Sequence, residues 1–195
     1  MSTYGRLVIL NGVSSAGKTT LATALRDEQA RAGDLWLLVG IDDILAKIPV
    51  QWLSLGLADG VGAQAHQGLA FEQMPDGLRL RIGPTARRLI DLYHQWVSDA
   101  VRAGFNVIVD DCVVDRETFE GWLRVLDGLA PTWVAVRCPP AVAEARELAR
   151  GDRAVGMAST QHDTVHRHVT YAIEIDTGEL TPAEAHEALR RGLGL

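Results

Sequence analysis

Short apolar runs alternate with longer amphipathic segments along the chain. Five of these runs are mostly continuous, which is typical of strands buried on both faces of a sheet, and they cover residues 6–10, 35–39, 105–109, 133–136 and 172–175. The segments between them have helical periodicity and predict helices at Lys18–Arg31, Pro84–Arg102, Arg116–Leu129, Pro140–Arg150 and Pro182–Arg191. Proline begins three of these helices, where its missing N–H costs nothing.

This alternation predicts parallel strands joined by crossover helices, and therefore an α/β fold: a three-layer α/β/α sandwich with a five-stranded parallel sheet. The chain has 195 residues, so we expect a single domain over residues 1–195. The stretch from Pro49 to Gly83 breaks the rhythm with six glycines and two prolines. Long insertions in compact domains are usually functional, so we expect residues 49–83 to bind the acceptor of any reaction; the alternative is a surface loop without a role.

The strongest motif follows the first apolar run. Residues Gly12 to Thr19 read GVSSAGKT, a complete G-x-x-x-x-G-K-[ST] phosphate loop with an apolar run before it and a helix after it. The backbone N–H groups of such a loop cradle phosphate oxygens, Lys18 places charge on the β- and γ-phosphates, and the Thr19 hydroxyl can bind Mg²⁺. The motif predicts ATP and Mg²⁺ as cofactors and a P-loop nucleotide-kinase-like fold. The expected nucleotide-binding residues are Gly12, Val13, Ser14, Ser15, Ala16, Gly17, Lys18, Thr19 and Thr20.

Two pairs of aspartates follow expected strands, at the edge where parallel sheets bind ligands. We predict that Asp110 holds the metal together with Thr19, and that Asp111 faces the acceptor because it points to the opposite side of the strand. Asp42 is the candidate general base, since a carboxylate beside the γ-phosphate can accept the proton of an attacking alcohol. The alternative for either pair is helix capping, and the two roles could also divide between Asp42 and Asp43.

Arginines gather near the expected end of the helix over residues 140–150. Arg146, Arg150 and Arg153 fall within eight residues of sequence. Planar guanidinium groups suit the charge of a phosphoryl group during transfer, so we expect a lid-like segment at about residues 146–158 that carries Arg150 and Arg153 as catalytic cations. The alternative is that Arg146 and Arg150, one turn apart, only complement the helix C-terminus while Glu147 makes surface ion pairs, and for Arg146 we favour this structural role.

Charge and cysteine content narrow the function further. Nineteen basic against 25 acidic side chains give a net charge of −6, so the chain repels polyanions and we expect no nucleic-acid partner. No apolar run reaches the roughly 18 residues of a membrane span, and no signal-peptide core follows the N-terminus. Cys112 and Cys138 are too few for a disulfide framework and indicate thiols in a reducing compartment. We therefore expect a cytoplasmic protein with a small-molecule partner. Assembly into a homo-oligomer is compatible with the sequence.

A phosphate loop does not by itself define what receives the phosphoryl group. A guanine-nucleotide switch usually carries an Asn/Thr-Lys-x-Asp string and an Asp-x-x-Gly string after the third strand, and neither occurs at those places. A carboxylate directly after the second expected strand instead favours a small-molecule kinase. A non-catalytic nucleotide-binding switch is the weaker alternative.

The same residues resemble the chloramphenicol phosphotransferase family over nearly the whole chain. The Ser-Ser-x-Gly-Lys loop together with an Arg-Gly-Asp-Arg segment is more specific than the phosphate loop alone. The resemblance is carried by residues 9–12, 14–18, 40–42, 82–84, 108–111, 136–138, 150–153, 156–158, 165–166, Tyr171 and 176–177.

This resemblance implies ATP-dependent phosphoryl transfer to a hydroxyl of an antibiotic, the primary alcohol of chloramphenicol in the namesake, for resistance or self-protection. It also implies Asp42 as the base, Lys18 as the phosphate clamp and Arg153 as a cation of the closing segment. We expect the acceptor site in the insertion and in the helix that starts near Pro84, with these candidate residues: Asp42, Trp52, Arg87 and Asp111.

The acceptor side also departs from the family. Residues 49–81 match it little, and Thr19 stands where a serine is expected, although the threonine keeps the hydroxyl. Another natural-product alcohol, such as a nucleoside antibiotic, or a housekeeping metabolite or nucleoside therefore stays open as the acceptor.

Overall fold

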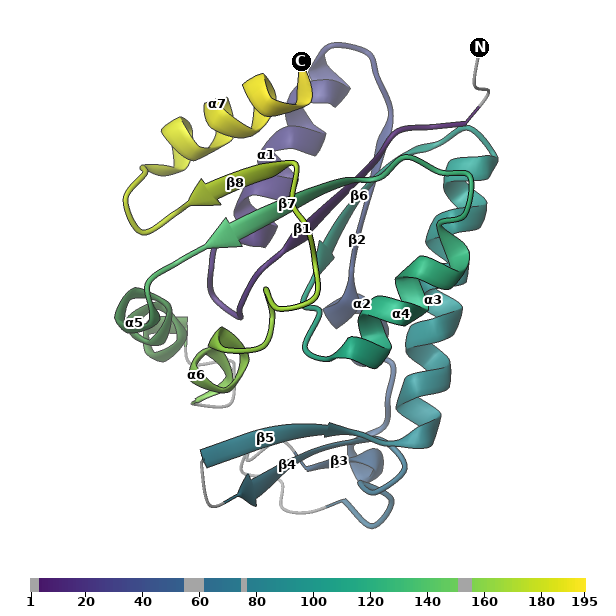
Figure 1. Ribbon diagram of the computed structural model, residues 1–195, viewed down its shortest axis with the longest axis vertical. Coiled ribbons are helices and arrows are strands. Elements are labelled where there is room, and N and C mark those ends of the chain that lie inside the picture. The colour runs from purple at the N-terminus through teal and green to yellow at the C-terminus, as the bar shows by residue number, and fades with distance from the viewer. Residues whose placement is uncertain (1–3, 55–61, 75–76, 151–155) are drawn as a thin grey trace.

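A five-stranded parallel sheet forms the centre of the molecule (Figure 1). The computed structural model describes residues 4–54, 62–74, 77–150 and 156–195. The strand order is β2-β6-β1-β7-β8, and every neighbouring pair is parallel. The strands are β1 (Leu7–Asn11), β2 (Trp36–Gly40), β6 (Asn106–Asp111), β7 (Thr132–Arg137) and β8 (Ile173–Asp176). Each predicted strand is present: β1, β2, β6 and β8 begin one residue later than predicted, and β7 extends one residue beyond its predicted range at each end.

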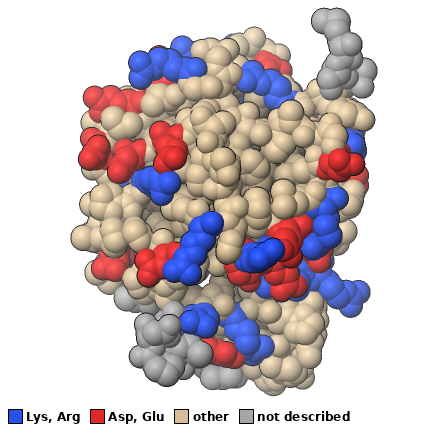
Figure 2. Space-filling model, in the orientation of Figure 1, with Lys and Arg blue, Asp and Glu red and all other residues tan. Residues whose placement is uncertain are grey.

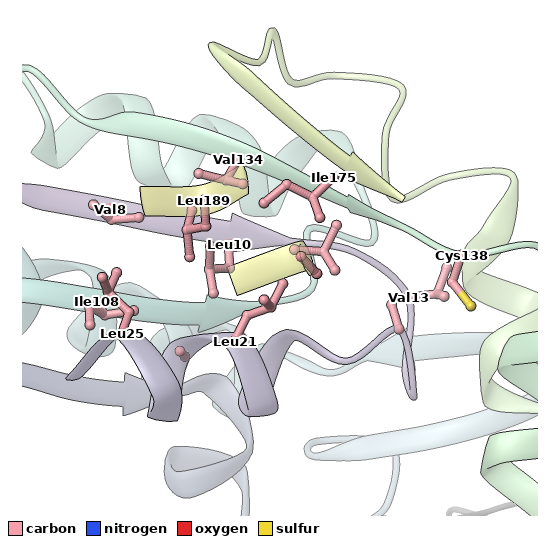
Figure 3. Packing of buried hydrophobic residues seen from close by; sticks show 14 of the residues in the cluster. Val8, Leu10, Val13, Leu21, Leu25, Ile108, Val134, Cys138, Ile175 and Leu189 are labelled. Atoms are coloured by element: carbon pink, nitrogen blue, oxygen red, sulfur yellow. The ribbon is translucent and has the colours of Figure 1, made fainter. Parts of the chain in front are cut away.

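Helices cover both faces of this sheet, because the apolar side chains of its central strand alternate between two cores. On one face Val8 and Leu10 pack with α1 (Lys18–Arg31) and α7 (Pro182–Leu193), as Figure 3 shows for Leu25 and Leu189. On the other face Leu7 and Ile9 pack with α3 (Pro84–Arg102) and α4 (Arg116–Val125). The predicted three-layer α/β/α sandwich is therefore the observed fold.

Most of the helices that were predicted beside the central sheet begin and end where expected. α1, α3 and α5 (Pro140–Arg150) have the predicted bounds. The prediction for α4 was too long, because the chain leaves the helix at Leu126 and turns through Gly128, whose φ is 72°. α7 continues to Leu193 and ends at Gly194 in the left-handed conformation.

The insertion contains a second, smaller sheet that the sequence analysis did not predict. The 3-10 helix η1 (Val50–Trp52) leads into β3 (Leu53–Ser54), and β4 (Leu69–Met74) pairs antiparallel with β5 (Gly77–Ile82). β3 joins this hairpin through parallel pairing with β4. The small sheet lies beyond the carboxyl ends of the central strands (Figure 1).

Two short helices lie between the central and small sheets. α2 (Ile41–Leu45) follows β2 and contacts α3, and α6 (Met157–His162) contacts β5. Within the described ranges, we find no helix with the length and apolar character needed to cross a bilayer.

Candidate active site

The phosphate loop connects the buried strand β1 to the first turn of α1. Ser15 (φ 62°) and Gly17 (φ 92°) adopt left-handed conformations that turn the chain back on itself. A side chain at Gly12 would meet the carbonyl oxygen of Val136 at 2.3 Å, so only glycine fits there. Lys18 is nearly buried, and its Nζ donates to the carbonyl oxygens of Gly12 (3.0 Å) and Val13 (2.9 Å). The lysine charge is thereby fixed across the mouth of the loop.

Thr19, in the first turn of α1, meets Asp110 at the carboxyl end of β6. β6 lies beside β1 with Asp110 opposite Leu10, and the Thr19 hydroxyl donates to Asp110 Oδ2 at 2.5 Å. Asp110 Oδ1 is 3.7 Å from Lys18 Nζ. A hydroxyl and a carboxylate are the hard oxygen ligands that Mg²⁺ shares with phosphate and water. The described residues contain no cluster of three or more His, Cys, Asp or Glu that would form a complete protein cage.

Asp42 and Asp43 have separate positions in α2. β2 ends at Gly40, which lies opposite Asp110 in the sheet. Asp43 Oδ2 accepts the backbone N–H of Gly40 at 2.9 Å and so caps the short helix. Asp42 lines the same cavity as Lys18, Thr19 and Asp110. Of the two residues, Asp43 makes the capping hydrogen bond, and Asp42 lines the cavity.

The cavity has a volume of about 410 Å³ and runs from this group of residues toward α5 and α7. Arg146 forms its other end, donating to Thr177 Oγ1 (3.2 Å) and to the Thr177 carbonyl oxygen (2.8 Å). Thr177 Oγ1 also donates to the Ala16 carbonyl oxygen at 2.7 Å, which ties β8 to the phosphate loop. Of the predicted nucleotide-binding residues, those that line the cavity are Ser14, Ser15, Gly17, Lys18, Thr19 and Thr20.

Two predictions for the arginine-rich region need correction. Arg146 does not simply complement the helix C-terminus, because Thr177 holds it at the cavity wall. Glu147 does not make surface pairs: it is 2% exposed, and its two oxygens accept the N–H groups of Gly156 (2.8 Å) and Ala158 (3.0 Å). The Arg150 side chain and all of Arg153 lie outside the described residues.

The structure does not bring Asp111 to the cavity. Its side chain is fully buried and accepts Trp122 Nε1–H (2.5 Å) and the Cys112 N–H (2.7 Å). Burial raises the pKa of Asp111 to about 6, although both hydrogen bonds oppose the shift. The strand alternation argument was right that Asp111 points away from Asp110, but its neighbour there is α4, so its placement does not support acceptor contact.

Arg87 and Trp52 are also absent from this cavity. Arg87 donates to both oxygens of Asp115 (2.7 and 3.2 Å) and to the Thr118 hydroxyl (2.8 Å), which joins α3 to the start of α4. Trp52 lies in the insertion, where its backbone packs closely against Gly68. The Arg87 contacts account for this arginine without a substrate.

Gln161 is a contact of the phosphate loop that sequence reasoning missed. Its Oε1 accepts the Ser14 N–H at 2.7 Å, although the two residues are far apart in the chain. Nearby, Asn11 Nδ2 donates to the Val165 carbonyl oxygen (2.8 Å) and to the Tyr171 hydroxyl (2.6 Å). Neither contact has a local sequence signal, because α6 and the segment after it are far in the chain from the phosphate loop and β1.

Comparisons of the sequence with known proteins found matches over nearly the whole chain. A family model described as "Chloramphenicol phosphotransferase-like protein" matches residues 5–193. Proteins from two strains of Mycobacterium tuberculosis, each named "Putative O-phosphotransferase", are 33% identical over 193 residues, covering 95% of this chain and 80% of theirs.

Solved structures of kinases share the fold. The Mycobacterium tuberculosis APS kinase CysC, in complex with AMPPNP and APS, superposes with a TM-score of 0.67 at 14% identity, covering 98% of this chain and 99% of that one. A sugar kinase from Janibacter gives a TM-score of 0.66 at 16% identity, covering 97% of this chain and 95% of that one. The fold is therefore that of P-loop kinases.

Proposed function

The chain belongs to the chloramphenicol phosphotransferase-like family, and from this premise we propose that it transfers the γ-phosphoryl group of ATP to a hydroxyl of a small molecule. Family and fold indicate a P-loop O-phosphotransferase. An antibiotic alcohol of the chloramphenicol type is the first candidate acceptor, since it gives the family its name. Phosphorylation of its hydroxyl would confer resistance or self-protection.

The observation that carries the proposal is the grouping of Asp42, Lys18, Thr19 and Asp110 around one cavity. In the proposed reaction, Asp42 accepts the hydroxyl proton as the alcohol oxygen attacks the γ-phosphorus, and the bond from that phosphorus to the β-phosphate oxygen breaks to release ADP. Lys18, fixed over the loop by two carbonyl oxygens, offsets charge on the β- and γ-phosphates. Arg150 and Arg153 remain proposed cations of the closing segment.

The residues also fit a bound magnesium ion. We assign Thr19 and Asp110 as the protein groups that would hold Mg²⁺, since their oxygens already meet beside Lys18. When bound, the ion would neutralise phosphate charge. Arg146 and Thr177, at the other end of the cavity, are placed to contact the remainder of the nucleotide.

We propose a cytoplasmic location for the enzyme. The two free cysteines support a reducing compartment, since Cys138 is buried and Cys112 is half-buried, and both remain thiols.

A panel of antibiotic and metabolite alcohols, incubated with γ-labelled ATP and Mg²⁺, tests the proposed function. We expect label on the hydroxyl of at least one alcohol, with ATP consumed much faster when that alcohol is present. The panel includes chloramphenicol, nucleoside antibiotics and ordinary nucleosides, so it also separates the alternative acceptors. Nucleotide that stays bound and unconsumed with every alcohol would instead indicate a switch and overturn the proposal.

A further inference from the structure

A second cavity of about 560 Å³ lies between the small sheet and the central body, outside the nucleotide cavity. Arg79 on β5 stands on one wall, Arg116 at the start of α4 on another, and Arg167 in the turn after α6 on a third. Figure 2 shows Lys and Arg side chains on both sides of the notch that separates the small sheet from the body. The arginines come from three segments far apart in the sequence.

The charges on these walls do not cancel. Asp115 and Asp163 are the two acidic residues of the lining, against three arginines. Asp115 already accepts from both terminal guanidinium nitrogens of Arg87, which is not part of the lining. Asp163 is 85% exposed to solvent, and the three arginines of the lining are exposed too, so solvent screens charges of both signs here. By formal charge, three arginines against two aspartates leave the lining one positive charge in excess.

Arg167 is the clearest source of that excess charge. Arg116 is paired with Glu120 at 2.7 Å, whereas the Arg167 guanidinium has no ion-pair or hydrogen-bond partner within the parts of the chain that the structure describes. A guanidinium has five N–H donors in a planar fork that matches a carboxylate, phosphate or sulfate. Arg167 is exposed, so an anion in the cavity would take the place of water at its guanidinium.

The turn that carries Arg167 is anchored on both sides. Before it, the Val165 carbonyl oxygen accepts from Asn11 at the end of β1. After it, the Tyr171 hydroxyl is held by Asn11 (2.6 Å) and by His166 Nδ1 (2.8 Å). Burial lowers the pKa of His166 to about 4, so this anchor stays neutral and unchanged at ordinary pH. Because this turn is already ordered, less conformational entropy is lost when an anion binds to it.

Gln161 connects this cavity to the phosphate loop. It lines the second cavity, is 5% exposed, and accepts the Ser14 N–H. Gln161 is thus a side chain that the second cavity and the phosphate loop share. This adjacency is the relation that an acceptor pocket needs with the donor phosphate.

We propose that the second cavity is the acceptor pocket, and that it selects alcohols carrying an anionic group, a carboxylate, phosphate or sulfate, which Arg167 binds with help from Arg79. The proposal rests on the proposed function and narrows it, because it favours a charged acceptor over a neutral one such as chloramphenicol. The hydroxyl to be phosphorylated would extend from the anchored anion toward the phosphate loop.

The test compares malonate with its neutral analogue malonamide, titrated into the full-length protein by calorimetry. Saturating ADP and Mg²⁺ block the phosphate loop, and a second titration uses Lys18→Ala without nucleotide. We expect malonate to bind at least about tenfold more tightly than malonamide in both titrations, and Arg167→Gln to lose about tenfold in malonate affinity. Arg31→Gln, at the far end of α1, is the matched control and should bind malonate like the wild type.

Equal binding of malonate and malonamide, no malonate binding, or equal losses in Arg167→Gln and Arg31→Gln would each overturn the proposal. Failure of the proposed function gives a different pattern. In that case the labelled-ATP panel yields no phosphorylated alcohol, while the malonate result is unaffected, because an anion binds Arg167 whether or not transfer occurs. Far-ultraviolet circular dichroism and urea midpoints of each variant establish that the proteins compared are folded.

Discussion

At the scale of single residues, Asp111 shows how a charge next to the site can serve the fold. It is fully buried, and the Trp122 indole and the Cys112 amide point their N–H groups at its carboxylate. Burial still outweighs these two donors and raises the pKa of Asp111 from 3.8 to about 6. The folded state therefore holds the Asp111 proton more tightly than the unfolded chain does.

This pKa shift predicts a pH dependence of stability with a definite sign. The contribution of Asp111 is fully present below its unfolded pKa of about 4 and is lost as pH rises through about 6, a change of about 3 kcal/mol. Urea unfolding between pH 4 and pH 7 should show this decline in the wild type and a smaller one in Asp111→Asn. Identical pH profiles of the two proteins would contradict the assignment.

The positions of site residues could be predicted from the sequence where a local backbone motif determines them. The phosphate-loop motif located Lys18 and Thr19, because the loop and the helix start fix both side chains. The contacts of Arg87 and Arg146 could not be predicted, since their partners, Asp115 and Thr177, come from distant segments. Sequence periodicity carries no information about such pairs.

At the scale of elements, Glu147 holds α5 and α6 together. Its buried carboxylate accepts two N–H groups of Gly156 and Ala158, at the N-terminus of α6, where a negative charge is also favoured by the helix dipole. These bonds join the two helices that flank residues 151–155. The position of α6 matters because Gln161 reaches the phosphate loop from it.

Replacing Glu147 should therefore cost stability. Glu147→Ala leaves two N–H groups without their acceptor, and we expect the free energy of unfolding to fall by about 1–3 kcal/mol in urea titrations. The matched control is Glu144→Ala, one turn earlier on α5 and exposed, which should change it by less than about 0.5 kcal/mol. Equal effects of the two substitutions would show that the Glu147 contacts contribute nothing.

Sequence patterns predicted some of the helices and strands well and others not at all. α1 and α3 were predicted to the residue, since a phosphate loop precedes one and a Gly-Pro step begins the other. β3, β4 and β5 were missed because their apolar residues are scattered among glycines and polar residues, and their pairing with one another only becomes evident in the structure. Short strands of this kind depend on their partners more than on their own sequence.

At the scale of the whole molecule, the parallel sheet brings three strand ends to one edge. β1 supplies the phosphate loop, β6 supplies Asp110 and β2 leads to Asp42, so residues from three parts of the chain share one cavity. The topology follows from the alternation of strands and helices and was predictable. The second cavity was not, because it depends on where the small sheet lies relative to α6.

Nucleotide binding should stabilise the whole fold. ADP with Mg²⁺ at 100 times its Kd should raise the free energy of unfolding by about 2.7 kcal/mol, measured by urea titration with and without ligand. Chelating the Mg²⁺ with EDTA should reduce this gain, and Lys18→Ala should lose most of it. Arg31→Ala removes a positive charge at the opposite end of the same helix and should keep the gain; a loss as large as that of Lys18→Ala would argue against a specific phosphate site.

The central claim is that Asp42 is the base of an O-phosphotransferase while its neighbour Asp43 is a helix cap. The most direct measurement compares the turnover of Asp42→Asn and Asp43→Asn on the best acceptor of the labelled-ATP panel, with ATP affinity measured in parallel. Turnover should fall by about 100-fold or more in Asp42→Asn with ATP affinity nearly unchanged. Asp43→Asn should keep turnover within a few-fold and lose about 1 kcal/mol of stability. Equal turnover of Asp42→Asn and the wild type would contradict the claim.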